Sequence, residues 1–385
     1  MSEYTRWSND PSVIGAPSLL HQAVGADTNS KRKISPSTIT PLAIRNLKAF
    51  LDATGWRCLY GLNLVNGTPE RTATEASFVS ATLGDRLIAF QIGNEPDHYV
   101  MNGLRPEGYG FQDYFREWSV LHRVVLTALP KARFAGPDIA EDLDWVEAFA
   151  SQAPEGVELL TGHHYAEGPP TDPSMTLRRL LTPDHEFASR VQRIKRIAEQ
   201  SRIPYCMAET NSCYSGGKAG VSDVFGSAFW SLEYLLELAQ SGERGVYFHG
   251  GATSIYTPIA GGSGKSFEPR PLYGGLLLFK ELLGSEIVSL QTQTIDSNTT
   301  VYAFRNPNRI LVINKGNEPA TLELEHAMRS IERLTLNAPS LHSTGEVSIG
   351  MQPLNEARRA PEWEAQERTH QLIAQPTSAS LFRLS

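Results

Sequence analysis

Alternating strand-like and helix-like segments predict an α/β fold for the larger, N-terminal part of this 385-residue chain. Short apolar runs recur between segments whose apolar residues have helical spacing, a pattern typical of parallel strands joined by crossover helices. From about residue 286, short strand-like runs follow one another with polar turns between them, which is typical of an antiparallel sandwich. We therefore predict a (β/α)8 TIM-type barrel over residues 1–285 and a C-terminal antiparallel β-sandwich domain over residues 286–385.

Six barrel strands are predicted from their apolar composition. They are Trp56–Leu64, Leu87–Gly93, Ala132–Ile139, Val157–Tyr165, Tyr205–Glu209 and Gly245–His249. Helical spacing predicts helices over Pro41–Ala53, Glu70–Thr82, Tyr109–Leu129, Trp145–Ala150, Phe187–Gln200, Val221–Ser241 and Leu272–Leu283. The sandwich strands are expected at Thr300–Phe304, Arg309–Asn314, Thr321–Leu324, Ile331–Leu336 and Ser378–Leu384. An open doubly wound sheet is the rival architecture, but it would favour a glycine-rich phosphate-binding turn, which the sequence lacks.

Composition and charge argue against several classes of protein. Hydrophobic residues make up 41% of the chain and charged residues 20%, which is a globular composition. No apolar run reaches the roughly eighteen residues of a membrane span. A net charge of −7 without a basic tract argues against a nucleic-acid partner. The three cysteines, Cys58, Cys206 and Cys213, lack metal-ligand pairing and are expected to behave as small buried hydrophobic residues.

Two carboxylates at strand ends indicate a particular chemistry. Glu95 ends an apolar strand in QIGNEPD, and Glu209 ends a later strand in CMAETN. In a barrel, the roughly three strand–helix units between them place both residues on one rim, where active sites are assembled. Cleavage of a glycosidic bond needs such a pair, one as acid and one as nucleophile or base. A single glutamate after a strand is more often a cap or a solvated residue, so the glycosidase interpretation depends on the pair.

Three segments give the chain a specific family resemblance. QIGNEPD, AETNSCYSGGKAGVSDVFGSAFWSLEYL and SIYTPIAGGSGKSFEPRPLYGGLLLFKELLG resemble glycoside hydrolase family 79, the β-glucuronidase and heparanase family. VYAFRNPNRILVINKGN and SASLFRLS resemble the C-terminal module of that family. The resemblance implies a retaining exo-acting β-glucuronidase with Glu95 as general acid/base, Glu209 as nucleophile, no cofactor, and a glucuronide-containing glycan or glycoconjugate as partner. A retaining enzyme should hold the two carboxyl groups about 5–5.5 Å apart.

The resemblance also implies substrate-binding residues. Tyr165 would lie beside the nucleophile, and Tyr214 and Tyr256 would bind the carboxylate of the substrate. Asn94, just before the acid/base, is suited to hydrogen-bonding a sugar hydroxyl. The chemistry of these residues agrees, because phenol and backbone donors can hold a uronate without placing a strong cation beside an electron-poor transition state. A loop tyrosine considered alone is more often a packing residue.

Other interpretations stay open from the sequence. A retaining glycosidase of the same clan that acts on neutral sugars would not need two tyrosines for a carboxylate. A carbohydrate-binding relative without activity would not need both glutamates. Endo action of the heparanase type is less favoured, because no paired basic clusters flank the segments that form the cleft. The pair His163 and His164 could indicate a metal site, but no third ligand has usable spacing, so no metal is expected.

The predicted barrel is two strands short. The family places the acid/base after the fourth strand and the nucleophile after the seventh, so two strands are missing before residue 56. We expect these strands to be absent, which leaves Trp56–Leu64 and Gly245–His249 each with an unpaired edge. Otherwise a stretch within Ser12–Ile39 must supply the pairing. Members of this family are often secreted or periplasmic, whereas this N-terminus lacks the apolar core of a signal peptide, so the location stays unknown.

Overall fold

The computed structural model forms two compact units. It describes residues 2–10, 37–152, 154–251, 253–262, 264–288, 297–326, 328–357, 361–366 and 369–385. The first unit comprises Met1–His164, His185–Thr210 and Ser241–Phe248, and the second comprises Tyr165–Asp184, Asn211–Gln240 and His249–Ser385. These units reflect packing, and the second contains segments from before residue 285. The domain boundary expected after that residue therefore stays a prediction.

A sheet of six strands forms the centre of the first unit. In spatial order they are β3 (Cys58–Leu62), β4 (Leu87–Ile92), β5 (Phe134–Ile139), β6 (Val157–Glu167), β7 (Tyr205–Cys213) and β8 (Val246–Phe248). Strands β3 to β6 pair in parallel, and so do β7 and β8. The order along the sheet is the order along the chain, as repeated strand–helix units require. All six strands predicted for this part of the chain are confirmed, but β7 continues to Cys213, so Glu209 lies within this strand and not at its end.

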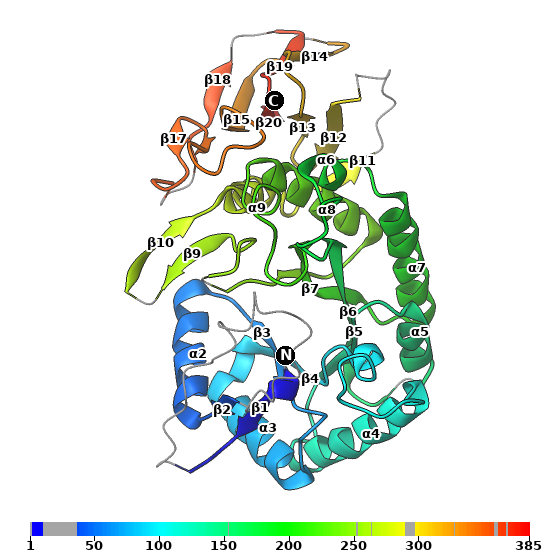
Figure 1. The fold of residues 1–385 in the computed structure, drawn as a ribbon. Coiled ribbons are helices and arrows are strands. Elements are labelled where there is room, and N and C mark those ends of the chain that lie inside the picture. The colour runs from blue at the N-terminus through cyan, green and yellow to red at the C-terminus, as the bar shows by residue number, and fades with distance from the viewer. Residues whose placement is uncertain are drawn as a thin grey trace. The chain divides into compact units, whose positions relative to one another are not determined.

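Helices of the first unit lie on the outer side of this sheet (Figure 1). They are α2 (Pro41–Thr54), α3 (Pro69–Leu83), α4 (Phe111–Ala128), α5 (Leu143–Gln152) and α7 (His185–Ser201), with the short turns η2 (Gly84–Arg86) and η3 (Pro96–His98). Local chemistry fixes their ends, since the Thr68 hydroxyl accepts from the Arg71 N–H at the start of α3 and Gly55, with φ 74°, ends α2. Trp118 of α4 packs edge-on against Phe134 of β5, with 6.1 Å between ring centroids. Such contacts bury the outer face of the sheet.

Strands β3 and β8 are the two edges of the sheet in the described part of the chain. There β3 pairs only with β4, and β8 pairs only with β7, so the expected unpaired edges are confirmed for these residues. The turn η1 (Ser2–Tyr4) leads into β1 (Thr5–Trp7), which pairs in parallel with β2 (Ser37–Ile39) in a separate sheet. Of the stretch Ser12–Ile39, the described residues 37–39 thus pair with β1 and not with β3. The rest of that stretch lies outside the described residues.

An antiparallel sheet dominates the second unit. In spatial order its strands are β11 (Glu286–Val288), β12 (Thr299–Arg305), β13 (Arg309–Asn314), β20 (Ser378–Leu384), β15 (Ile331–Asn337), β16 (Ser348–Ile349) and β17 (Gln352–Pro353), and β18 (Glu364–Gln366) pairs with β15. Two further antiparallel pairs are β9 (Ile259–Gly262) with β10 (Lys265–Pro269), and β14 (Ala320–Glu323) with β19 (Gln371–Ala374). The antiparallel region predicted after residue 286 is confirmed.

The second unit also contains helices. The helices α8 (Gly226–Ser241) and α9 (Pro271–Lys280) share a hydrophobic core with the antiparallel sheet, to which Leu232 and Leu278 contribute, and the short α6 (Leu177–Leu180) belongs to the same unit. Helical spacing predicts α8 from Val221, and this start is wrong. The Lys218 N–H donates to the Ser222 hydroxyl at 2.9 Å, so the chain forms a turn there before the helix begins.

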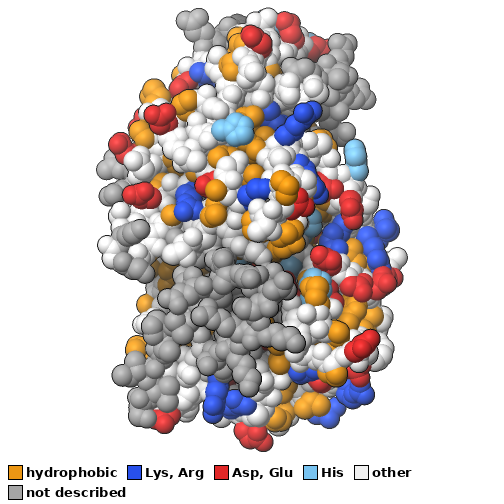
Figure 2. Space-filling model, viewed as in Figure 1, with side chains coloured by type: hydrophobic (Ala, Val, Ile, Leu, Met, Phe, Trp, Pro, Cys, Tyr) orange, Lys and Arg blue, Asp and Glu red, His pale blue; other side chains and the backbone are white. Residues whose placement is uncertain are grey.

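The surface charges and the burial of the three cysteines agree with what the composition predicts. On the face in Figure 2, acidic and basic side chains are interspersed among uncharged ones. No helix within the described residues is long and apolar enough to cross a membrane. Cys206 and Cys213 are buried and Cys58 is half-buried, and all three are free thiols. Burial raises the pKa of Cys58 and of Cys213 to about 11, so these thiols stay protonated at neutral pH, as small hydrophobic residues do.

Candidate active site

Glu95 lies in the loop after β4, where the backbone turns sharply. Gly93 and Glu95 have φ angles of 93° and 53°. A non-glycine residue in the left-handed region carries strain on the order of 1–3 kcal/mol, and such strain concentrates at functional sites. The Glu95 N–H donates to the Asp138 carbonyl at 2.8 Å. This bond ties the loop after β4 to the end of β5 and fixes the direction of the Glu95 side chain.

Asp97 secures the same loop. Its carboxylate oxygens accept hydrogen bonds from three consecutive backbone N–H groups, those of Ala140, Glu141 and Asp142, at 2.8, 2.9 and 3.0 Å. Hydrogen bonds to a carboxylate are shorter and stronger than those between neutral groups. The loop that carries Glu95 is therefore clamped to the loop after β5. Asp97 could not be singled out from the sequence, because its partners are backbone groups more than forty residues away.

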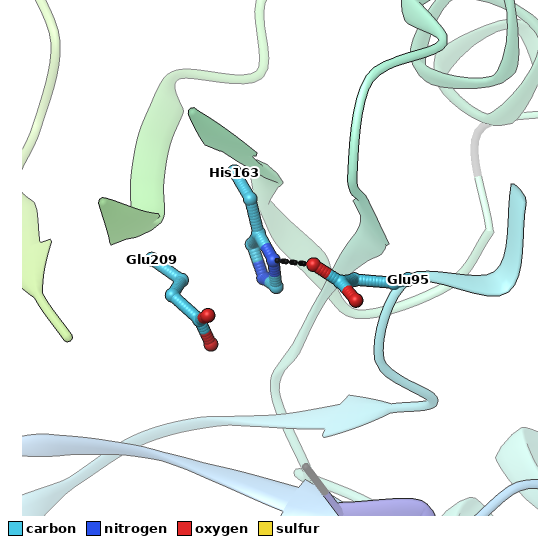
Figure 3. A group of neighbouring side chains, drawn as sticks. All are labelled: Glu95, His163 and Glu209. Carbon is cyan, nitrogen blue, oxygen red and sulfur yellow. Dashed lines mark hydrogen bonds and ion pairs between the residues drawn. The ribbon is translucent and has the colours of Figure 1, made fainter. Parts of the chain in front are cut away.

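Glu209 of β7 projects into the same space as Glu95 (Figure 3). One oxygen of each carboxylate and one ring nitrogen of His163, on β6, lie within 4.8 Å of one another. All three residues belong to the first unit. The structure thus brings together the two glutamates that the sequence places at separate strand ends, and it adds a histidine between them.

His163 links Glu95 to a second carboxylate that is completely buried. Its Nδ1 lies 3.0 Å from Glu95 Oε1, and its Nε2 lies 3.1 Å from Asp138 Oδ1. Burial opposes the charged imidazolium, but the charges of Asp138 and Glu209, together with hydrogen bonds to Asp138 and Glu95, raise the pKa of His163 well above its ordinary value. In its charged form the ring donates from both nitrogens, one to each carboxylate.

The N-terminal turn η1 packs near the same edge of the sheet. The buried Tyr99 hydroxyl donates to the Glu3 carboxylate at 2.7 Å, and the Asn63 amide donates to the Glu3 carbonyl at 3.0 Å. Burial, the charge of Glu3 and the charge of Glu95 raise the pKa of Tyr4. Tyr4 therefore lies within electrostatic range of the Glu95 carboxylate. Tyr4 could not be predicted as a neighbour of the site, because Tyr4 lies far from Glu95 along the chain.

A cavity of about 260 Å³ adjoins these side chains. Its lining comes from the strands and strand ends of the parallel sheet: Cys58, Leu59, Gly61, Gln91, Gly93, Asn94, Asp138, His163, Ala208, Glu209 and Tyr247. Ligand pockets commonly start at about 300 Å³, so this volume suits a single sugar ring better than a long chain. Asn94 and Glu209, both predicted as site residues, line it.

Glu95, His163 and Glu209 also form a group of described residues whose geometry could hold a metal ion. Sequence spacing offered no third ligand, because the carboxylates come from other strands. His164 is separate from this group, and its ring packs against Phe187 with 4.2 Å between centroids. Both ring nitrogens of His163 lie within hydrogen-bonding distance of carboxylates. This arrangement suits the orientation of a catalytic carboxylate.

The three tyrosines predicted to bind substrate lie together in the second unit. The Tyr165 ring centroid lies 6.4 Å from that of Tyr214 and 6.3 Å from that of Tyr256. Tyr214 is 41% exposed, whereas Tyr256 is buried, and the Tyr256 hydroxyl hydrogen-bonds with the ring of His249. The cluster therefore offers one phenol that solvent reaches and one whose hydroxyl is oriented by a histidine.

Neighbouring backbone holds these tyrosines in place. A Cβ atom on Gly168, whose φ is 145°, would lie 2.1 Å from the Tyr214 ring, so only glycine fits there. The Asn211 amide donates to the carbonyls of His249 and Tyr256 at 2.8 and 3.4 Å. The loops that carry Tyr214 and Tyr256 are thus shaped by close packing and by a buried amide.

Comparison with known proteins identifies the family of the chain. Residues 39–236, which include β3 to β7 and both glutamates, match the family described as glycosyl hydrolase family 79, N-terminal domain. The chain belongs to glycoside hydrolase family 79. Membership in this family makes the chain a glycoside hydrolase by descent and confirms the resemblance seen in the sequence.

Relatives of this family 79 chain include glucuronidases and heparanases. A β-glucuronidase of Aspergillus niger is 26% identical over 381 residues, which cover 87% of this chain and 70% of that protein. The heparanase of Bos taurus is 26% identical over 275 residues, which cover 67% of this chain and 48% of that protein. The chain thus spans about half the length of the heparanases that it matches.

Solved structures share the fold at low sequence identity. A 4-O-α-L-rhamnosyl-β-D-glucuronidase from Fusarium oxysporum has a TM-score of 0.73 at 18% identity, covering 100% of this chain and 86% of that one. A family 51 arabinofuranosidase from Xanthomonas axonopodis has a TM-score of 0.62 at 15% identity, covering 88% of this chain and 78% of that one. At these identities the likeness establishes the fold.

Proposed function

We propose that the chain carries the active site of a retaining exo-acting β-glucuronidase, with Glu95 as general acid/base and Glu209 as nucleophile. The observation that carries the proposal is the approach of the two carboxylates, whose oxygens lie within 4.8 Å of each other beside a cavity of about 260 Å³. Retaining glycosidases hold their carboxyl groups about 5–5.5 Å apart, whereas inverting enzymes leave about 6.5–9.5 Å for a water. The spacing therefore favours direct attack by a carboxylate.

Each carboxylate has one task in each step of this mechanism. In the first step a Glu209 oxygen bonds to the anomeric carbon, the glycosidic C–O bond breaks, and Glu95 gives its proton to the departing oxygen. In the second step Glu95 takes a proton from water, and the water oxygen bonds to the anomeric carbon. The bond from the anomeric carbon to Glu209 breaks in the same displacement, which releases the sugar and leaves Glu95 protonated and Glu209 ionised for the next cycle.

His163 and Asp138 act in this proposal as positioning residues. The His163 ring holds Glu95 Oε1 at 3.0 Å, and Asp138 holds the other ring nitrogen at 3.1 Å. A catalytic carboxylate must stay within a fraction of an ångström of its productive position, because a shift of about 1 Å can cost on the order of 10²-fold in rate. The buried Asp138–His163 pair supplies this restraint from behind the reacting atoms.

Substrate selection is proposed for Asn94, Tyr165, Tyr214 and Tyr256. Tyr214 and Tyr256 would hydrogen-bond the carboxylate of the glucuronide, Tyr165 would bind substrate beside the nucleophile, and Asn94 would bind a sugar hydroxyl. The support is the grouping of the three tyrosines and the names of the relatives, glucuronidase and heparanase. Exo action is favoured by the small volume of the cavity beside Glu209.

The finer architecture belongs to the same proposal. We take the six parallel strands as part of a (β/α)8 barrel and the antiparallel sheet after residue 285 as part of a β-sandwich domain. The order of β3 to β8 and their outer helices supports the barrel. The antiparallel pairing of β12, β13, β20 and β15 supports the sandwich.

The test is a comparison of two aryl substrates that differ only at C6. The chain should hydrolyse an aryl β-D-glucuronide and be at least about tenfold slower on the matching glucoside, because a charge-assisted hydrogen bond contributes about 1.5–3 kcal/mol. Tyr214→Phe and Tyr256→Phe should each reduce this preference, measured as the ratio of kcat/KM values. Equal losses on both substrates would make the tyrosines structural, and turnover of the glucoside alone would overturn the uronate assignment.

A further inference from the structure

A second cavity lies at the amino ends of the parallel strands, which we call the amino edge of the sheet, whereas Glu95 and Glu209 lie toward the carboxyl ends, which we call the carboxyl edge. Its volume is about 820 Å³, and it is lined by Lys48, Arg57, Leu83, Gly84, Asp85, Arg86 and Arg133, a set that we call the basic cavity. Three of these arginines directly precede β3, β4 and β5, so the amino ends of three neighbouring parallel strands bring them together. The length of β4, about 20 Å at about 3.3 Å per residue, separates the basic cavity from the active site.

The basic cavity carries more positive than negative groups although the chain as a whole is acidic. Its four cations have three carboxylates for neighbours, since Asp85 lines the cavity, Asp52 binds both Lys48 and Arg86, and Glu158 lies 3.8 Å from Arg133. A net positive recess in a chain of net charge −7 concentrates anions from solution.

Arg57 and Arg133 keep much of their donor capacity. The Arg57 Nε donates to the Asp85 carbonyl at 3.2 Å, and one terminal nitrogen of Arg133 donates to the Leu87 carbonyl at 3.0 Å. A guanidinium has five N–H donors arranged in a planar fork that matches carboxylate and sulfate oxygens. Bonds to backbone carbonyls fix the direction of both forks without neutralising their charge. The two side chains are thus oriented cations.

Two exposed aromatic residues neighbour lining residues of the basic cavity in the sequence, and they are an independent observation. Trp56 directly precedes Arg57 and is 64% exposed, and Phe50, two residues after Lys48 in α2, is 50% exposed. The two rings meet edge to face with 5.8 Å between centroids. Large aromatic rings left in water favour a ligand that covers them, and a flat indole packs well against the C–H face of a sugar ring. A simple inorganic anion would not need such a surface.

We infer that the basic cavity is a binding site for an acidic saccharide, with Arg57 and Arg133 bonding its carboxylate or sulfate groups and Trp56 packing on a sugar ring. The uronate chemistry of this ligand rests on the proposed function, whereas the cavity, its charge and the exposed rings do not. The volume of about 820 Å³ suits two or three sugar residues. The substrate of the enzyme is then one part of an acidic glycan. The basic cavity holds another part of the same glycan.

The experiment measures binding in the full chain with Glu209→Gln, which removes turnover. The probe is an octasaccharide of alternating glucuronate and N-acetylglucosamine, titrated by calorimetry, and a neutral glucan oligosaccharide of equal length is the comparison. Arg57→Gln and Trp56→Ala should each weaken binding of the acidic probe at least about tenfold. Arg196→Gln, an exposed arginine on α7 outside the cavity lining, is the matched control and should leave the Kd unchanged. Thermal unfolding checks that each variant folds.

A second readout locates the bound probe. Hydrogen exchange should slow in residues 48–57 and 84–87 when the octasaccharide binds. Unchanged affinity in both Arg57→Gln and Trp56→Ala, or protection confined to the active-site loops, would overturn the inference. A different result would be that inorganic sulfate displaces the octasaccharide while Trp56→Ala binds it with unchanged affinity. That result would show a general anion site in place of a saccharide site. Aryl glucuronide turnover is assayed separately on the unaltered chain, so failure of the proposed function would leave the binding result readable.

Discussion

The two edges of the parallel sheet present opposite chemistry. At the carboxyl edge, Glu95 and Glu209 approach within 4.8 Å around a histidine that is 2% exposed. At the amino edge, cations surround a larger cavity, and the Arg133 side chain is 41% exposed. The same strands position both groups, because parallel strands bring all their starts to one edge and all their ends to the other. A parallel sheet can thus hold a catalytic and a binding surface without mixing their charges.

Burial makes the two edges respond differently to substitution. At the carboxyl edge, Glu95, Asp97 and Asp138 are held by hydrogen bonds of 2.8 to 3.1 Å. The hydrogen bond between His163 and Asp138 is shielded from solvent, because both side chains are buried. The charges at the amino edge are partly solvated, and exposed ion pairs contribute little, about 0–1 kcal/mol each. We therefore expect substitutions at the carboxyl edge to change kcat strongly and substitutions at the amino edge to change binding moderately. Substitutions in the interior between the two edges should change only the stability of the fold.

The largest effect among the supporting residues is expected for Asp138→Asn. The variant keeps the size of the side chain but removes the charge that most raises the pKa of His163. The pKa of His163 should fall, as measured by NMR titration, and kcat on an aryl β-D-glucuronide should fall on the order of 10²-fold because Glu95 loses its restraint.

Glu147→Gln is the matched control for Asp138→Asn, because Glu147 is an exposed carboxylate on α5 that pairs with Arg193 at 3.0 Å. This control should leave both the pKa of His163 and kcat unchanged. If Asp138→Asn raised KM alone and the pKa of His163 did not move, Asp138 would be a structural residue. The difference between the two edges of the sheet would then not depend on the buried network.

The smallest effect on turnover is expected for Glu75, whose carboxyl group is buried in the first unit away from both edges. The Tyr60 hydroxyl donates to Glu75 Oε1 at 2.7 Å, and burial raises the pKa of Glu75 to about 7 although Tyr60 and Arg71 oppose the shift. The folded chain therefore binds more protons than the unfolded chain between about pH 4.5 and 7. Its free energy of unfolding falls as the pH rises through this range and stays lower above it.

Glu75→Gln removes this proton binding while the amide oxygen still accepts from Tyr60. The variant should be more stable than the unaltered chain by about 3 kcal/mol at pH 8 and nearly equal to it below about pH 4. Urea unfolding at both pH values measures the difference, with the exposed Glu199→Gln on α7 as control. The kcat of the variant should equal that of the unaltered chain. Equal destabilisation at both pH values would show that the Glu75 carboxylate is needed for packing.

Much of the fold was predictable because it depends on local pattern. All six parallel strands and the seven predicted helices overlap the elements of the structure, since apolar periodicity over a few residues decides each one. The start of α8 was predicted too early because a turn at Lys218 competes with the helix. Glu95 and Glu209 could be found because each directly follows an apolar run.

The rest depends on contacts between distant residues. Asp138 and His163 become partners only when β5 and β6 pair, and the sequence shows neither the burial nor the charge that results. Asp97 bonds to backbone groups, which leave no signature in the sequence. The basic cavity escaped the sequence analysis because Lys48, Arg57, Arg86 and Arg133 are dispersed along the chain and form no basic tract.

The central claim is that Glu95 and Glu209 have different roles, and azide distinguishes them. Glu95→Ala and Glu209→Ala are each incubated with azide and an aryl β-D-glucuronide whose leaving group needs no proton, and the product anomer is assigned by NMR. In Glu95→Ala the Glu209 ester still forms, so azide attacks it from the opposite face and gives the β-azide. In Glu209→Ala azide takes the place of the missing carboxylate and gives the α-azide. Formation of the same anomer by both variants would contradict the assignment.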